Sequence, residues 1–200
     1  MITVAVTGNA ASGKSLVCDI FERLGAYVIS LDELAREVVK PHTEVFKKIV
    51  EHFGEEILTP EGDLNRRRLR QIITTDPEAR KTLERFTHPA IFDLMDKEIA
   101  SIRTARGDRI IVIEVPLLIE RGLQDRFDVV ILVDVESEIQ KRRLSIRDNV
   151  SDSEAQALLA IQMPTEKKRK YADFIIKNNG SMKELEIVSK EIYKKIAERS

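Results

Sequence analysis

An eight-residue segment near the start of the chain has the residues of a phosphate-binding loop. The segment Gly8-Asn9-Ala10-Ala11-Ser12-Gly13-Lys14-Ser15 fits the pattern G-x-x-x-x-G-K-[ST], between an apolar run and a helical pattern. Glycines let the backbone curve around a phosphate with its N–H groups inward, and a helix start adds partial positive charge. We expect Lys14 to reach the β- and γ-phosphates of a nucleotide and the Ser15 hydroxyl to bind Mg²⁺. The alternative is a glycine-rich turn before an ordinary helix.

Two carboxylates follow apolar runs and could serve phosphoryl transfer. Asp32 comes after the run 26–30, where an open α/β sheet places its ligands, so it could orient an acceptor hydroxyl and accept its proton. Ser30-x-x-Glu33 also fits a capping box, which would make Asp32 only a favourable charge in a first helical turn. Glu114 ends a later apolar run and could hold Mg²⁺ through water, or cap the next turn. The residues alone leave both choices open.

Arginines gather in two further segments. Arg143 and Arg147 lie four apart, on one face of an expected helix. Positive charge around a transferring phosphoryl group would supply much of the rate, although Glu138 and Asp148 could equally make this a solvated, neutralised face. The run Arg66-Arg67-Arg68-Leu69-Arg70 could meet the phosphates of a substrate, but most charge runs are solvated surface.

The elements that must position these residues are expected to form a doubly wound α/β sheet. Five short, β-branched runs alternate with helical stretches, and several are continuously apolar, as in parallel strands covered on both faces. The expected strands are Ile2–Val6, Ala26–Ser30, Arg109–Val115, Asp128–Asp134 and Asp173–Lys177. The lengths between them suit crossover helices, so the sequence predicts a five-stranded parallel sheet.

Two helical spans interrupt this alternation within a single domain of 200 residues. We interpret 41–106 as an inserted, substrate-binding helical subdomain with a turn at Thr59–Asp63, and 142–170 as a mobile lid with a capping box at Ser151-x-x-Glu154. The core then comprises 1–40, 107–141 and 171–200. A last helix, capped by Ser181-x-x-Glu184, should pack on the core through Leu185, Val188, Ile192 and Ile196.

The bulk composition excludes several classes of protein. Lys and Arg number 33 against 34 Asp and Glu, so a net charge of −1 offers no field for nucleic acid. We expect a cytoplasmic protein without membrane contact, because neither a signal sequence nor a membrane-length apolar run occurs. The single cysteine, Cys18, is expected in the core, and the scattered histidines do not support a zinc site.

Beyond the phosphate loop, the chain resembles the dephospho-coenzyme A kinase family along essentially its whole length. The resemblance includes the stretch from Phe21 to Asp32 and five later pieces in the order that the family has. These pieces are Gly62 to Arg66, Thr87-His88-Pro89, Val115 to Glu120, Gln162-Met163-Pro164, and Ala172 to Gly180. Each piece is short, but their order and spacing together make the match specific.

The resemblance implies a nucleoside-monophosphate-kinase fold and transfer of the ATP γ-phosphoryl group to the ribose 3′-hydroxyl of dephospho-coenzyme A, with Mg²⁺, in the last step of coenzyme A synthesis. It implies Asp32, Lys14 and Arg147 as catalytic residues, and Arg143 against the adenine. The ATP-binding residues would be Gly8, Ala11, Ser12, Gly13, Lys14, Ser15, Leu16, Arg143, Asn179 and Gly180. The substrate-binding residues would be Asp32, Arg66, His88, Pro116 and Leu117.

Some of these positions have plainer explanations. His88 before Pro89 would also suit a turn, and Asn178-Asn179-Gly180 would form an N-G turn after the last strand in any case. The chain departs from the family at Ser30, where an Asp is usual, and at Leu16, where a Thr is usual. Asp32 keeps the expected catalytic carboxylate, and Leu16 keeps the backbone N–H.

Three other functions fit parts of the sequence. Another small-molecule kinase would share the phosphate loop, and only the acceptor subdomain separates it. A GTP-dependent switch would normally carry an N-K-x-D motif, which does not occur here. A coenzyme- or nucleic-acid-binding module without catalysis would show no acceptor-dependent turnover.

Overall fold

The computed structural model describes residues 1–106 and 110–199, and these form two compact units. A sheet unit contains Met1–Ser30 and Ile102–Ser200, and a helical unit contains Leu31–Ser101. This division falls about ten residues before the expected start of the helical insertion at 41. The expected core segment 107–141 begins outside the described residues, so its first boundary stays a prediction.

The sheet unit is built on five parallel strands. They are β1 (Ile2–Thr7), β2 (Tyr27–Ser30), β3 (Ile110–Glu114), β4 (Val129–Asp134) and β5 (Phe174–Lys177). Their spatial order is β2-β3-β1-β4-β5, and every neighbouring pair is parallel. The predicted sheet is confirmed, with strand ends shifted by a residue or so; Arg109 lies outside the described residues. The three central strands are almost wholly buried, which explains their continuous apolar runs.

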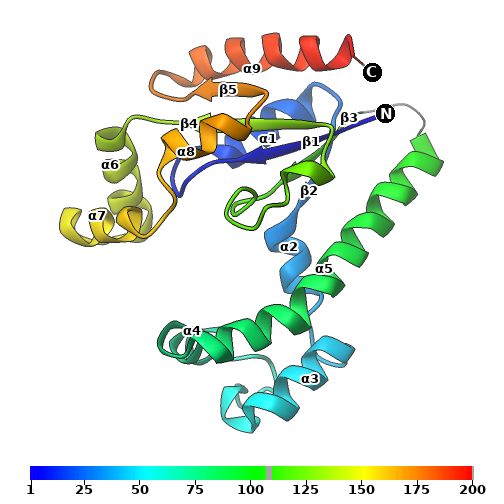
Figure 1. The fold of residues 1–200 in the computed structure, drawn as a ribbon, viewed down its shortest axis with the longest axis vertical. Coiled ribbons are helices and arrows are strands. Elements are labelled where there is room, and N and C mark those ends of the chain that lie inside the picture. Colours follow the sequence, from blue (N-terminus) through cyan, green and yellow to red (C-terminus); the bar gives the residue numbers. More distant parts are fainter. Residues whose placement is uncertain (107–109, 200) are drawn as a thin grey trace. The chain divides into compact units, whose positions relative to one another are not determined.

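Two helices pack together over this sheet. They are α1 (Lys14–Arg23) and α9 (Met182–Ala197), and α9 is the helix at the top of Figure 1. Phe21 of α1 and Leu185, Ile192 and Ile196 of α9 are buried in the same core as the strands. The capping box of Ser181 and Glu184 starts α9, as predicted, and Cys18 is a buried core residue whose pKa is raised by that burial.

Three short helices connect β4 to β5. They are α6 (Ser137–Asp148), α7 (Asp152–Ala160) and α8 (Thr165–Lys168), the last continued by the 3₁₀ turn η3 (Arg169–Tyr171). The predicted capping box of Ser151 and Glu154 begins α7. The connection between β3 and β4 contains only turns and the 3₁₀ turn η2 (Gln124–Arg126).

The helical unit has its own small core. It contains α2 (Leu31–Glu37), α3 (Glu44–Phe53), the 3₁₀ turn η1 (Glu55–Ile57), α4 (Arg66–Thr75) and most of α5 (Pro77–Arg106). Ile49 and Ile57 are fully buried at its centre. A turn at Thr59–Asp63 forms as predicted, closed by a 2.7 Å bond from the Thr59 N–H to the Asp63 carbonyl.

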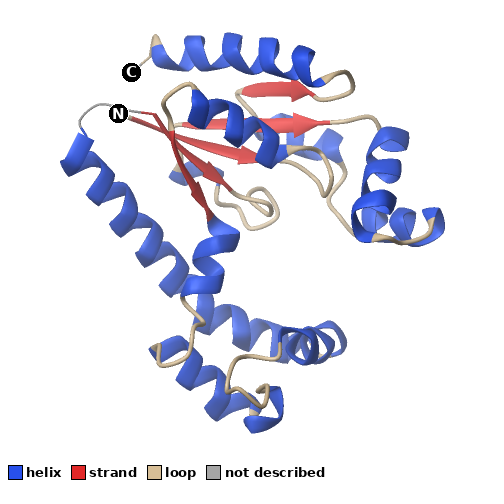
Figure 2. Cartoon of the chain, turned by 180° about the vertical axis from the view of Figure 1, so that it is seen from behind, coloured by secondary structure: helices blue, strands red, loops and turns tan. Residues whose placement is uncertain are grey.

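The residues around His88 are helical, so the turn considered for them is wrong. Thr87, His88 and Pro89 lie inside α5, a 30-residue helix that continues through the proline. Figure 2 draws α5 in blue as a long helix. Pro89 cannot donate the backbone hydrogen bond of its position, but flanking turns and packing carry the helix on. Within the described ranges, no helix has both the length and the apolar composition that crossing a membrane requires.

Candidate active site

The backbone of the phosphate loop needs glycine at both ends. Gly8 and Gly13 have φ values of 153° and 95°, which L side chains rarely adopt. A Cβ on Gly8 would lie 2.5 Å from the Val133 carbonyl oxygen, and one on Gly13 would collide with the Asn178 side-chain amide. The tight path of the backbone between β1 and α1 therefore requires glycine at both positions of the motif.

Lys14 and Ser15 stand at the start of α1, as the motif predicts. The Lys14 ammonium donates to the carbonyl oxygens of Gly8 and Asn9, at 3.0 and 3.2 Å, so it is held over its own loop. The Ser15 hydroxyl donates to Glu114 Oε1 at 3.0 Å. Parallel pairing of β1 with β3 sets Val6 beside Glu114 and so brings this carboxylate to the loop.

The hydroxyl and carboxylate of Ser15 and Glu114 fit a magnesium site. Both are hard oxygen donors, and Mg²⁺ is usually bound by one or two such protein groups together with phosphate oxygens and waters. Leu16, expected to contribute only its backbone N–H, leaves its side chain partly exposed. Ser12 is buried, and its hydroxyl has no hydrogen-bond partner among the described residues.

The turn after β5 joins the phosphate loop to α6. The buried Asn178 side chain donates to the Ser12 carbonyl at 2.8 Å, and the Asn178 carbonyl accepts from Arg143 at 2.9 Å. Asn179 exchanges two hydrogen bonds with Glu136, at 2.8 and 2.9 Å. The structure thus brings the predicted residues Arg143 and Asn179 to the same turn, and adds Asn178.

Arg147 differs from Arg143 in its partner. Its guanidinium makes two bonds to the adjacent Asp148 carboxylate, at 2.7 and 3.0 Å, on an exposed part of α6. The guanidinium keeps the pKa of Asp148 below its ordinary value. Gly180 lies against the Glu184 carboxylate of the capping box, so a side chain there would require that carboxylate to move.

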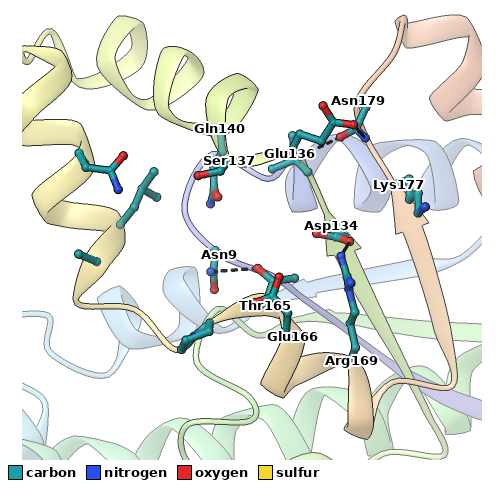
Figure 3. Close-up of a pocket in the computed structure, with 15 residues that line it drawn as sticks. Asn9, Asp134, Glu136, Ser137, Gln140, Thr165, Glu166, Arg169, Lys177 and Asn179 are labelled. Carbon is teal, nitrogen blue, oxygen red and sulfur yellow. Dashed lines mark hydrogen bonds and ion pairs between the residues drawn. The ribbon is translucent and has the colours of Figure 1, made fainter.

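A cavity of about 530 Å³ lies beside the phosphate loop in the sheet unit (Figure 3). Asn9, Gln140 and Thr165 line it, and so do Arg169 and Asp134, whose guanidinium and carboxylate bond at 2.7 Å. That hydrogen bond raises the pKa of Arg169, so the guanidinium stays charged. A second ion pair joins the fully buried Lys168 to Glu120 at 2.5 Å and ties α8 to the segment after β3.

Five predicted acceptor-side residues are spread over the two units. Asp32 is exposed in the first turn of α2, and Arg66 is exposed at the start of α4. His88 lies midway along α5 with its ring 6.2 Å from that of Phe92. Pro116 and Leu117 follow β3 in the sheet unit, and the Leu117 side chain is exposed. Their roles stay predictions.

Sequence reasoning missed several residues that hold the loop in place. Asn178 is one: it belongs to the Asn178-Asn179-Gly180 signal, but only Asn179 and Gly180 were predicted to bind ATP. Gln140 and Gln162 are two more, and both bond to Ala10 of the phosphate loop. Gln162 carried a signal through the Gln162-Met163-Pro164 piece, whereas nothing in the local pattern distinguished Gln140 from any other glutamine.

Comparisons with known proteins agree on one family. A family model described as dephospho-CoA kinase matches residues 2–184. A dephospho-CoA kinase from Geobacter sulfurreducens is 48% identical over 98% of both chains. A crystal structure from Thermus thermophilus aligns with a TM-score of 0.82 at 32% identity, over 97% of both chains. The structure of dephospho-CoA kinase from Campylobacter jejuni aligns with a TM-score of 0.74 at 30% identity, over 98% of this chain and 97% of that one. A shikimate kinase from Acinetobacter baumannii, 14% identical with a TM-score of 0.54, shares the fold alone.

Proposed function

The chain belongs to the dephospho-CoA kinase family, and on that premise we propose that it transfers the γ-phosphoryl group of ATP to the ribose 3′-hydroxyl of dephospho-CoA. The products are ADP and CoA, and the reaction is the last step of CoA biosynthesis. The observation that carries the proposal is the phosphate loop, with Lys14 held over it and Ser15 bonded to Glu114.

The nucleotide is bound chiefly through the loop and the turn after β5. Backbone N–H groups and the start of α1 meet the phosphates, while Lys14 exchanges its carbonyl partners for phosphate oxygens. Arg143, fixed by the Asn178 carbonyl, lies against the adenine, and Asn179 and Gly180 form the edge of that site. Arg147 exchanges Asp148 for a phosphate oxygen, because an exposed ion pair contributes little.

Ser15 and Glu114 are the residues that would hold Mg²⁺, Ser15 directly and Glu114 through water. A divalent cation supplies charge neutralisation at the phosphate oxygens when it is bound. The fit rests on the oxygen donors and their mutual hydrogen bond.

The acceptor hydroxyl is oriented by Asp32. The oxygen of the acceptor hydroxyl bonds to the γ-phosphorus as the bond from that phosphorus to ADP breaks. The hydroxyl proton passes to the Asp32 carboxylate. Arg66, His88, Pro116 and Leu117 are proposed to bind dephospho-CoA. Segment 142–170 is proposed to act as a lid that excludes water, since water would compete as an acceptor.

The nearest rival is a kinase of the same fold with another alcohol acceptor. A shikimate kinase has a similar fold, so the fold alone does not distinguish the two acceptors. Family membership favours dephospho-CoA, since the relatives match over nearly the whole chain. A cytoplasmic location stays a prediction from the sequence.

The test is acceptor-dependent ADP release by the purified protein. We expect turnover with ATP, Mg²⁺ and dephospho-CoA, and at least about tenfold less with adenosine, shikimate or no acceptor. Mass spectrometry should find one added phosphate on the ribose 3′-oxygen. Equal turnover without dephospho-CoA would contradict both the acceptor and the exclusion of water.

A further inference from the structure

One residue of the phosphate loop is held from both sides by glutamines of different elements. The Ala10 N–H donates to Gln162 Oε1 at 2.9 Å, and the Ala10 carbonyl accepts from Gln140 Nε2 at 2.6 Å. Gln140 is a buried residue of α6, and Gln162 is a half-buried residue just after α7. Both polar groups of one residue are thus bonded to side chains more than a hundred positions away.

The neighbouring residue strengthens the same attachment. The Asn9 side-chain amide donates to the Met163 carbonyl at 3.2 Å and to Thr165 Oγ1 at 3.3 Å, and Figure 3 shows the second bond. Asn9 and Ala10 therefore make three hydrogen bonds to segment 162–165, in addition to the bond from Gln140. All of these groups lie in the sheet unit.

The attachment lies next to a strained part of the loop. Ala11 has φ 58°, in the left-handed region that residues with a Cβ avoid. Such a conformation persists only when its surroundings over-determine it. The glutamines hold the preceding residue, and Asn178 holds the carbonyl of the following one, Ser12. The hydrogen bonds on both sides of Ala11 are thus surroundings of the kind that such a conformation requires.

We propose that Gln162 and Gln140 are positioning residues that hold Ala10, and with it the phosphate loop, in its nucleotide-binding shape. The inference rests on the proposed function and adds that the segment returning from α7 is part of the nucleotide site. Neither glutamine need touch the nucleotide. Each acts through the backbone of Ala10.

The two glutamines use opposite ends of their amides, which allows a charge-matched test. Gln162 accepts through Oε1, so Gln162→Glu keeps an acceptor for the Ala10 N–H. Gln140 donates through Nε2, so Gln140→Glu sets a carboxylate against the Ala10 carbonyl. Both variants add one negative charge beside the same residue and differ in the direction of the hydrogen bond to Ala10. Gln140 is also the more buried of the two, and Gln162 Nε2 makes a further 3.5 Å bond to the Leu158 carbonyl, which both Gln162 substitutions lose. Gln162→Met removes the bond altogether.

The measurement is the affinity for ADP and for a non-hydrolysable ATP analogue by calorimetry, with KM for each substrate. We expect Gln162→Met to weaken nucleotide binding about three- to tenfold, as loss of one net hydrogen bond does, with KM for dephospho-CoA within about twofold. Gln162→Glu should bind the nucleotide more tightly than Gln140→Glu. Gln71→Met, which alters an exposed glutamine of α4 in the helical unit, is the control and should bind nucleotide like wild type.

Unfolding temperatures without nucleotide separate folding from positioning. If Gln140→Glu does not fold, the pair Gln162→Met and Gln162→Glu still tests the proposal. Gln162→Glu should keep much of the nucleotide affinity that Gln162→Met loses. Unchanged nucleotide affinity in Gln162→Met, or no advantage of Glu over Met, would overturn the proposal. Absence of activity toward dephospho-CoA in the wild-type protein would refute the proposed function. The nucleotide affinities of the variants would still test whether the glutamines position the loop.

Discussion

The nucleotide half and the acceptor half of the proposed site are built differently. In the sheet unit, Ser15, Arg143 and Asn179 each make a hydrogen bond to another segment of that unit, and Lys14 bonds to its own loop. In the helical unit, Asp32 and Arg66 are exposed on the first turns of their helices. The polar groups proposed for ATP are therefore held by hydrogen bonds within the sheet unit, whereas Asp32 and Arg66 are exposed to solvent.

The difference follows from what each half must recognise. A triphosphate is met mainly by backbone N–H groups, and these point inward only if the loop is held by its surroundings. Exposed carboxylates and arginines on helices need no such support, but they lose side-chain freedom when the acceptor binds. Substitutions should accordingly separate the halves by their effects on kcat and on the two KM values.

The largest effect is expected from Asp32→Asn. Because the amide cannot accept the hydroxyl proton, kcat should fall about 10²- to 10⁴-fold while KM for ATP stays near normal. Glu33→Gln, the next acidic residue in the same helical turn, is the control and should keep most activity. Full activity of Asp32→Asn in steady-state kinetics would make Asp32 a structural residue.

Lys14→Met should impair the nucleotide half of the proposed site. Loss of the ammonium removes charge from the β- and γ-phosphates, so kcat/KM for ATP should fall about 10²- to 10³-fold. Affinity for dephospho-CoA, measured by calorimetry, should change little. Lys47→Met, which alters an exposed lysine of α3, should match wild type. An equal loss of affinity for both substrates would erase the distinction between the halves.

Arg66→Gln tests whether the basic run on α4 meets the acceptor. Loss of one charge-assisted hydrogen bond should raise KM for dephospho-CoA about tenfold and leave KM for ATP unchanged. Arg70→Gln, an exposed arginine of the same helix, serves as the matched variant. If neither variant raises KM for dephospho-CoA, the run is solvated surface. If both raise it equally, the run meets the acceptor and Arg66 has no special role in it.

The smallest effects concern stability, and their signs should differ between the units. In the helical unit, burial first, and then the charges of Glu33 and Glu37, raise the pKa of Glu98. Ionisation is thus disfavoured in the folded state, and this penalty grows as the pH rises above the ordinary value of 4.5. Glu98→Gln should raise the unfolding temperature at pH 7 and have less effect near pH 4.

Glu184 of the capping box on α9 should show the opposite sign. Hydrogen bonds from the Ser181 backbone and side chain lower its pKa, so its charge stabilises the fold above pH 4.5 and less as the pH falls through the lowered value. Glu184→Gln should slightly lower the unfolding temperature at pH 7, with the difference vanishing in acid. A drop that persists unchanged at low pH would exclude the charge as its cause.

Local patterns in the sequence determined most of the sheet unit. Short β-branched runs located all five strands, the G-x-x-x-x-G-K-S motif located the loop, and two capping boxes located the starts of α7 and α9. These signals lie within a few consecutive residues, because turn chemistry, helix capping and strand burial are short-range effects. The turn considered at His88 failed because one proline signal was weaker than the packing of a long helix.

Only the tertiary structure decided which residues support the loop. Glu114, Asn178, Gln140 and Gln162 come from segments about 100 to 170 positions from the residues that they bond. No periodicity in the chain records such pairings, because they arise when strand order and helix packing bring the segments together. The sequence alone thus defined a nucleotide loop and its family, while the folded chain determined how that loop is held in shape.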